Sequence, residues 1–104
     1  MTRATRTHPK IRKEKILKAA VKLSIKLGYK NITRDRVAEL ADVSSALVGN
    51  YFPRMADLKN AVMRTAIQQE IVEIIAQGLT LKDPRVLKIS KTLRGRIMEF
   101  LKIK

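Results

Sequence analysis

The sequence predicts an all-helical protein of about five helices that follow a short basic arm. Two observations carry this prediction. Apolar residues recur at three- and four-residue steps, which is the spacing that one buried face of a helix requires. Residues that typically start or stop helices stand between these apolar segments, namely Gly28, Thr33, Ser44 and Asp83. At 104 residues and without an internal repeat, the chain fits one small domain.

The first helix is expected to follow an arm at residues 1–10, which is basic and has almost no apolar side chain. Pro9 disfavours helix at the residue before it, and Gly28 favours a stop after Leu27. We therefore place this helix at residues 11–27. Its inward positions are Ile16, Leu17, Ala20, Leu23 and Leu27. A row of lysines lines another face, which we interpret as a solvated surface.

Two short helices are expected next, on either side of a tight turn. Thr33 is the predicted N-cap of a helix at residues 34–41, and Ser44 is the predicted N-cap of a helix at residues 45–51. In the second of these helices, Val48 points inward by periodicity. Two short helices across a tight turn are typical of a helix-turn-helix motif.

Two longer helices are expected in the rest of the chain. The stretch over residues 54–77 contains no glycine or proline, so it predicts one uninterrupted helix that starts behind Pro53 and stops at Gly78. The final helix is predicted to start with Asp83 as its N-cap and Pro84 as its first residue.

Residues 54–104 are predicted to form a two-helix dimerisation region, because a domain this small gains buried surface by pairing with a second copy. The predicted interface consists of Ile67, Ile71, Ile74, Ile75, Leu93, Ile97 and Phe100. The alternative role of such residues is the core of the single chain. We expect no small-molecule pocket, because two helices that also pair with a partner do not enclose the volume that a drug-sized ligand needs.

The chain is strongly basic, with 23 Lys and Arg against 9 Asp and Glu and a formal net charge of +14. The expected partner is therefore a polyanion, and double-stranded DNA in particular. The positive charge gathers at both ends, while residues 37–81 contain three Lys or Arg against five acids. The segment from Ser44 to Phe52 has no charged side chain.

Several other classes of protein are excluded by the same composition. Cysteine is absent and His8 is the single histidine, so we expect no cysteine-containing zinc site and no metal cluster. No nucleophile with a base, carboxylate pair or phosphate loop is visible, so we expect neither an enzyme nor a bound cofactor. No apolar run approaches the roughly 20 residues that span a bilayer, so we expect a cytoplasmic, nucleoid-associated protein without membrane contact.

The DNA contacts are predicted from the way a helix-turn-helix docks, with its second helix in the major groove and its first across the phosphate backbone. Asn50 fits the edge of adenine, and Leu47 fits a thymine methyl group. Arg3 and Arg6 of the arm either follow the minor groove or form a solubilising tail. The predicted DNA-contacting residues are Arg3, Arg6, Thr33, Arg34, Arg36, Ser44, Ser45, Leu47, Gly49, Asn50, Tyr51 and Arg54.

The segment ILKAAVKL and the later segment GYKNITRDRVAELADVSSALVGNYFPRMADL together resemble the N-terminal DNA-binding domain of tetracycline-repressor (TetR) family regulators, over residues 11–65. The matching residues are Ile16, Leu17, Ala19, Ala20, Gly28, Tyr29, Thr33, Val37, Ala38, Ala41, Val43, Ser44, Tyr51, Phe52, Pro53 and Leu58. This resemblance implies a three-helix DNA-binding head, here residues 11–53, and a fourth helix that links the head to a dimerisation body.

The sequence departs from the family pattern at three positions. Asp42 stands where the family usually has glycine in the turn, although aspartate also tolerates the left-handed conformation. Gly49 replaces an aromatic residue that commonly contacts a phosphate, and it costs about 1 kcal/mol of helix propensity against alanine. Met55 replaces a frequent lysine, and Arg54 can supply the missing charge. The body is also much shorter than the family's usual ligand-binding body, which is why we do not carry over its effector mechanism.

The predicted function is a sequence-specific transcription regulator, a repressor that binds a palindromic operator as a homodimer. The half-sites of such an operator lie about 34–36 Å apart, or a multiple of that distance. The alternative is a protein-interaction module, such as an antirepressor or an accessory factor of replication or partition, with weak or non-specific DNA binding. The three departures from the family pattern motivate this alternative, which requires a protein partner.

Overall fold

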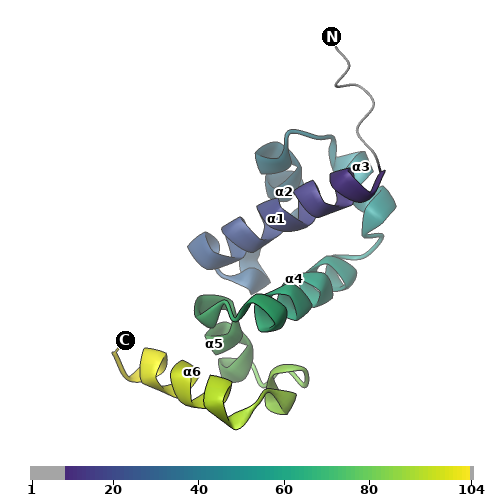
Figure 1. Cartoon of the computed structure of the whole chain (residues 1–104). Coiled ribbons are helices and arrows are strands. Elements are labelled where there is room, and N and C mark those ends of the chain that lie inside the picture. Colours follow the sequence, from purple (N-terminus) through teal and green to yellow (C-terminus); the bar gives the residue numbers. More distant parts are fainter. Residues whose placement is uncertain (1–8, 104) are drawn as a thin grey trace.

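The computed structural model describes residues 9–103, and within that span it contains six α-helices, two 3-10 helices and no strand. The α-helices are α1 (Pro9–Leu27), α2 (Arg34–Ala41), α3 (Ser45–Tyr51), α4 (Met55–Gln69), α5 (Val72–Thr80) and α6 (Lys91–Ile103) (Figure 1). The 3-10 helices are η2 (Tyr29–Asn31) and η3 (Val86–Lys88). The prediction of an all-helical chain is therefore confirmed for these residues. None of these helices is long and apolar enough to cross a membrane.

The predicted arm falls largely outside the described part of the chain, together with the predicted DNA contacts Arg3 and Arg6. The described part begins inside that predicted arm, because Pro9 and Lys10 already belong to α1. Proline suits the first position of a helix, since the N–H that it lacks would have no helical partner there.

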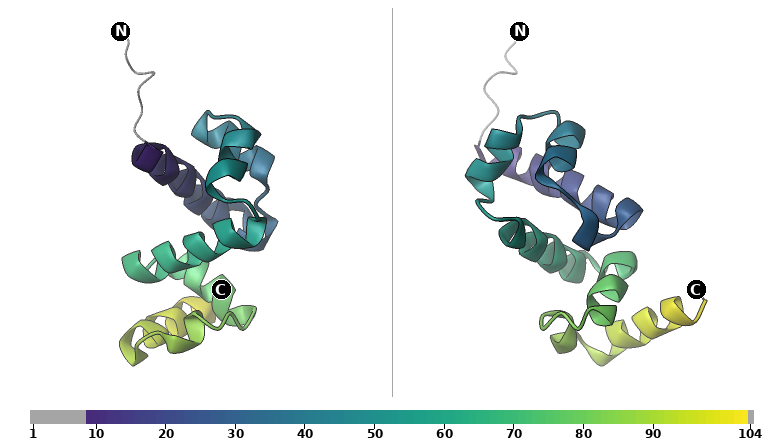
Figure 2. Two further views of the ribbon diagram at one scale, coloured as in Figure 1. Left: turned by 90° about the vertical axis from the view of Figure 1, so that its right-hand side faces the viewer. Right: turned by 180° about the vertical axis from the view of Figure 1, so that it is seen from behind.

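The helices form an elongated stack whose extents are 49 × 22 × 22 Å. α1, α2 and α3 make one end, which we call the head, and α5 and α6 make the other end of the stack (Figure 1, Figure 2). α4 packs against α1 on one side and against α5 on the other, so it connects the head with α5 and α6. We call α4, α5 and α6 together the body. The helix α6 packs mainly on α5, and this arrangement accounts for the length of the molecule.

One apolar core runs through both parts. Its completely buried side chains in the head are Ile16, Ala20, Val37 and Val48. Its completely buried side chains in the body are Leu58, Val62, Met63, Ala66, Ile74, Ile75, Val86 and Ile97. Burial of side chains of this size is the main favourable term in folding, at about 1.5–3 kcal/mol for each large one.

The prediction of one uninterrupted helix over residues 54–77 is wrong, because the chain turns at Glu70. Glu70 adopts the left-handed conformation, with φ 54° and ψ 46°, and the Ile71 N–H bonds back to the Ala66 carbonyl at 2.8 Å. A non-glycine residue can hold this conformation at a cost of roughly 1–2 kcal/mol, so the absence of glycine did not exclude the turn. The turn directs α5 onto the end of α1 and lets Ile74 become completely buried.

The predicted helix stop at Gly78 is also wrong, because this glycine lies inside α5 and is buried. A β-carbon at Gly78 would lie 2.6 Å from both Met63 Cε and Val86 Cγ2. Such a distance is too short for any side chain, so glycine here allows α5 to pack closely against α4 and η3.

The final helix starts later than predicted. Asp83 does not cap it; its Oδ1 instead accepts a hydrogen bond from the Arg85 backbone N–H at 2.9 Å, in the turn that leads to η3. α6 begins after Ser90, whose Oγ accepts a hydrogen bond from the Leu93 N–H at 3.2 Å. Asp83 thus caps the turn before η3 and not α6, and Ser90 caps α6.

Gln77 joins the head to the body. Its Oε1 accepts a hydrogen bond from the Tyr29 backbone N–H at 2.6 Å, and its Nε2 donates to the Ser24 carbonyl oxygen at 3.1 Å. The last carbonyls of a helix have no partner within that helix. One side chain of α5 therefore accepts from the first N–H of η2 and gives the Ser24 carbonyl a second donor besides the Gly28 N–H.

Asp83 forms a second link between the same parts. It is 8% exposed, and its Oδ2 accepts hydrogen bonds from the Tyr29 hydroxyl at 3.4 Å and from Arg85 Nη2 at 3.1 Å. Arg85 Nη2 also donates to Asn60 Oδ1 of α4 at 2.7 Å. Burial, and then the negative charge of Asp83, raises the pKa of the Tyr29 hydroxyl above its ordinary value.

We predict that Tyr29 makes the fold less stable at alkaline pH. In the unfolded chain its hydroxyl titrates near its ordinary pKa of 10.0, whereas in the folded chain the pKa is higher. The neutral hydroxyl therefore stabilises the fold fully below that ordinary value, and this contribution is lost as pH rises through the folded pKa. The Tyr29→Phe variant should lack this loss.

The measurement is the free energy of urea unfolding of both proteins from about pH 8 to about pH 11, a range that spans the ordinary tyrosine pKa. The difference between the two proteins should shrink as pH rises, while titration of the lysines affects both equally. Parallel curves over the whole range would contradict the role assigned to Tyr29.

Candidate nucleic-acid interface

The helix-turn-helix begins with two side-chain caps. Thr33 Oγ1 accepts a hydrogen bond from the Arg36 backbone N–H at 3.2 Å, at the start of α2. Ser44 Oγ accepts one from the Leu47 N–H at 3.1 Å, at the start of α3. Both caps are the predicted ones, because capping depends only on residues within one helical turn.

The turn between α2 and α3 depends on Asp42, which adopts the left-handed conformation with φ 59° and ψ 48°. Its N–H bonds to the Glu39 carbonyl at 3.2 Å, and the Val43 N–H bonds to the Ala38 carbonyl at 3.0 Å. Aspartate therefore performs the conformational role for which the resembling family usually has glycine, as the sequence led us to expect.

The inner side of α3 packs on the head. Val48 is completely buried and Phe52 is nearly so. A hydrogen bond also ties α3 to α2, since Ser45 Oγ donates to Asp35 Oδ1 at 2.5 Å. Ser45, predicted to read bases, thus already uses its hydroxyl proton within the head, and Asp35 has a neutral partner.

Arg34 lies across α3 at Gly49. Its Nη2 donates a hydrogen bond to the Pro53 carbonyl oxygen at 2.9 Å. A β-carbon at Gly49 would lie 3.5 Å from both Cζ and Nη1 of Arg34, so the guanidinium rests against the bare backbone of this glycine. Arg34 is half-buried, and its Nε has no hydrogen-bond partner among the described residues. Arg34 therefore braces the carboxyl end of α3, a role that sequence reasoning missed because the two residues lie on different helices.

The outward side of α3 presents small and neutral groups. Ala46 and Asn50 are exposed. The side chain of Asn50 makes no hydrogen bond to any described residue, so its carboxamide is available to a ligand. Leu47 and Tyr51 are half-buried and pack partly against the core. The exposed surface of α3 thus offers one amide that can form paired hydrogen bonds, with apolar groups around it.

Cationic side chains lie on the elements that precede and follow α3 in the chain. The side chain of Arg36 is exposed at the start of α2, and Lys13 Nζ of α1 lies 5.5 Å from the centre of the Phe52 ring. Arg54 is exposed after α3 and forms an ion pair with Asp57 at 3.2 Å. The hydrogen bonds between these two partners lower the pKa of Asp57 and raise that of Arg54. Arg54 therefore offers a charge that is already shared with a carboxylate.

The predicted dimerisation residues lie mainly in the interior of the single chain. Four of them are buried: Ile74, Ile75, Leu93 and Ile97. The other three are half-buried: Ile67, Ile71 and Phe100. A side chain without exposed surface cannot contact a second copy, so the four buried residues match the alternative role of monomer core. Periodicity identifies an apolar face but not the helix that covers it.

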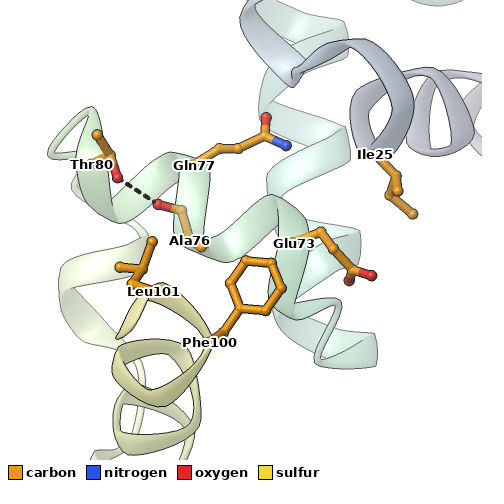
Figure 3. A pocket seen from close by; sticks show the side chains of 7 residues that line it. All are labelled: Ile25, Glu73, Ala76, Gln77, Thr80, Phe100 and Leu101. Carbon is orange, nitrogen blue, oxygen red and sulfur yellow. Dashed lines mark hydrogen bonds between the residues drawn. The ribbon is translucent and has the colours of Figure 1, made fainter. Parts of the chain in front are cut away.

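Phe100 still reaches the surface, where it lines a groove of about 240 Å³ between α1, α5 and α6. Figure 3 shows its ring pointing from α6 toward α5, with Ile25 of α1 across the groove. We call the residues Ile25, Ala76, Phe100 and Leu101 the apolar face. An adjoining groove shares Glu73 and Phe100 with the first one and is lined by Glu70, Val72, Arg96 and Glu99 in addition.

No group of three or more metal-ligating side chains occurs within residues 9–103. Comparisons of this chain with models of known protein families, with characterised proteins and with solved structures give no match. The nucleic-acid interface is therefore argued from its residues and their geometry.

We predict opposite effects on stability for two substitutions of Gly49. Gly49→Ala should stabilise the protein by about 0.5–1 kcal/mol, because alanine favours helix and its β-carbon makes an ordinary contact with Arg34. Gly49→Val should destabilise it relative to that alanine variant, because the γ-methyl groups on both sides of its β-carbon displace the Arg34 guanidinium from Pro53.

A double-mutant cycle with Arg34→Ala, measured by urea unfolding, checks this prediction. The penalty of valine relative to alanine should fall by roughly 1 kcal/mol when Arg34 is absent, leaving only the difference in helix propensity. An unchanged penalty in both backgrounds would show that Arg34 does not brace α3 through Gly49.

Proposed function

We propose that this protein is a sequence-specific DNA-binding transcription regulator, a repressor that binds a palindromic operator as a homodimer. The observation that carries the proposal is the pair α2 and α3, in which both helices are capped and the left-handed Asp42 sets the turn. Val48 and Phe52 fasten α3 to the head, while Asn50 stays exposed. This is the arrangement by which a helix-turn-helix presents its second helix to the major groove.

Base recognition is assigned to the outward side of α3. The Asn50 carboxamide can donate to adenine N7 and accept from the adenine N6 amino group, a pairing worth about 1–3 kcal/mol against a wrong base. The methyl group of Ala46 and the exposed parts of Leu47 fit the methyl group of thymine. A neutral helix suits this task, because discrimination depends on base edges rather than on phosphate charge.

Phosphate binding is assigned to the cations around α3. Residues 9–36 contain ten Lys or Arg against Glu14 and Asp35, and Asp35 is engaged by Ser45. Arg36 is exposed at the start of α2, Lys13 lies by the Phe52 ring, and Arg54 can exchange part of its bond with Asp57 for a phosphate oxygen. Such contacts set affinity and register, and they make binding depend on salt.

The homodimer is assigned to the apolar face around Phe100 rather than to the buried isoleucines. A two-fold contact places the same patch of both copies together, so the patch must complement itself. Val72 and Phe100 supply apolar surface in the adjoining groove, where Arg96 is already paired with Glu70 of the same chain, so the contact between copies is assigned to apolar side chains. This dimer and the three-helix head are the features that a TetR-like regulator with a shortened body requires.

The experiment is a protection footprint at near-physiological salt on duplexes selected from a random pool. We expect a discrete palindromic footprint with half-sites about 34–36 Å apart, or a multiple of that distance. In the Asn50→Ala variant, affinity for the selected duplex should fall by about 1–3 kcal/mol while affinity for random DNA stays unchanged.

The matched control is Arg36→Ala, which removes an exposed charge at the start of α2. It should weaken binding to selected and random DNA alike and reduce the salt slope by about 1. Equal losses on both DNAs for the Asn50 variant would refute the assigned base reader. Absence of any selected sequence would favour the protein-interaction alternative.

A further inference from the structure

The carboxyl-terminal end of the molecule carries a second cationic surface, on one side of α6. Lys91, Arg94, Met98 and Lys102 follow one another at steps of three, four and four residues, which places them on one side of a helix. Lys91, Met98 and Lys102 are exposed, and Arg94 is half-exposed. With the exposed Lys88 of η3, these four residues form what we call the basic flank.

The basic flank is held in place by Arg94. Its Nη2 donates a hydrogen bond to the Leu87 carbonyl oxygen at 3.1 Å, and this bond ties the start of α6 to η3. None of the four cations in the basic flank forms an ion pair with a carboxylate of residues 9–103. Their charges are therefore available to an external anion.

The carboxylates of the body lie elsewhere. Arg96, Glu99 and Phe100 point to the other side of α6, where they line a groove with Glu70 and Glu73. Arg96 pairs there with Glu70. The remaining acid near α6, Asp83, is buried and bonded to Arg85. The carboxylates near α6 thus gather with Arg96 in this groove and not among the cations of the basic flank.

The basic flank lies at the far end of the molecule from α3 (Figure 1, Figure 2). The long dimension is 49 Å, whereas the major groove that α3 would enter is only about 12 Å wide and 8.5 Å deep. Between the two cationic ends, residues 37–81 hold three Lys or Arg against five acids. The positive charge therefore lies in two separate stretches of the sequence, and the stretch between them carries more acids than bases.

We propose that the basic flank binds the phosphate backbone of a second DNA segment, so that one protein molecule joins two stretches of duplex. The proposal rests on the proposed function for the first segment, which the head binds. It adds a contact that sets affinity without carrying direct sequence information, because the cations of the basic flank are assigned to phosphates and not to base edges.

Duplex DNA fits this surface better than a membrane does. A helix that lies in a membrane surface needs an exposed apolar face, whereas Leu93 and Ile97 of α6 are buried against the body. Only Met98 supplies apolar surface within the basic flank. Cations spaced along one helix match the row of phosphates along a strand, which carries one charge every 3.4 Å or so.

The test uses an immobilised duplex that carries a selected sequence and a second, fluorescent duplex of random sequence in solution. Protein bound to the first duplex should capture the second. The variant Lys88→Gln, Lys91→Gln, Lys102→Gln removes three exposed charges and leaves the Arg94 bond intact. It should capture at least about tenfold less, and its salt slope for random DNA should fall by about 2.7, since each lost phosphate contact contributes about 0.9.

The matched control is Lys18→Gln, Lys22→Gln, Lys26→Gln, which removes three exposed charges from α1 and changes the net charge equally. It should retain capture when the immobilised duplex is saturated with protein, because its three lysines belong to the segment that serves the first duplex. The basic-flank variant should bind the selected duplex within about twofold of the original affinity, because it alters neither the reading surface nor the cations of the head. Failure of the proposed function would appear separately, as an Asn50→Ala variant that loses nothing on the selected duplex.

Three results would overturn the proposal. The first is undiminished capture by the basic-flank variant. The second is an equal loss of capture in both triple variants, which would show that net charge alone matters. The third is displacement of the second duplex by polyglutamate at equal charge concentration, which would identify the basic flank as a surface for an acidic polypeptide.

Discussion

The buried carboxylate of Asp83 sets the relation between the two halves of this molecule. A charge this deeply buried is tolerated only when its oxygens are bonded, and Asp83 meets this condition with Tyr29 from the head and with Arg85, which in turn holds Asn60 of α4. Gln77 adds two bonds to the same junction. The bonds of Asp83 and Gln77 thus connect Tyr29 and Ser24 of the head with α4, α5 and the segment that follows α5, so one network of polar contacts holds the two halves together.

Because this junction holds the head and the body together, it determines which surfaces lie at the two ends of the long molecule. The head lies at one end, where its helix α1 packs on α4, and α6 lies at the other end, where it packs on α5. A rigid separation keeps the neutral outward surface of α3 apart from the basic flank of α6. Under the two proposals, the first surface reads bases and the second holds phosphates, so the two surfaces do not compete for the same DNA.

Within the head, the stretch from Ser44 to Phe52 needs no charged side chain, because different elements supply the charge and the contacts with bases. Charge is supplied by neighbouring elements, through Lys13, Arg36 and Arg54, while α3 itself offers Asn50 and small apolar groups. Gly49, which looked like a lost phosphate contact, provides the flat backbone against which Arg34 rests. An arginine that braces α3 thus occupies the space of a bulky side chain on α3 itself.

The features that could be predicted from the sequence are the local ones. Thr33 and Ser44 cap their helices because a cap needs only the next three residues. The left-handed turn at Glu70 and the late start of α6 depend on packing between distant segments, so periodicity could not reveal them. For the same reason Ile74 and Ile97 could be recognised as apolar but not assigned to core or interface. In the candidate site, Asn50 followed from helical periodicity, whereas the brace by Arg34 required the fold.

The most direct test of the central claim is a disulfide cross-link between α3 and the major groove. The chain contains no cysteine, so Ala46→Cys introduces a unique thiol on the outward side of α3, and Gln68→Cys on α4 serves as the control. Each of two duplexes carries a selected sequence with one thiol tethered to the major-groove edge of a base, in one half-site or at the symmetric position in the other. We expect the α3 variant to form the cross-link at symmetric positions in both half-sites and the α4 variant to form none. A cross-link from both variants, or from neither, would contradict the claim that α3 enters the major groove.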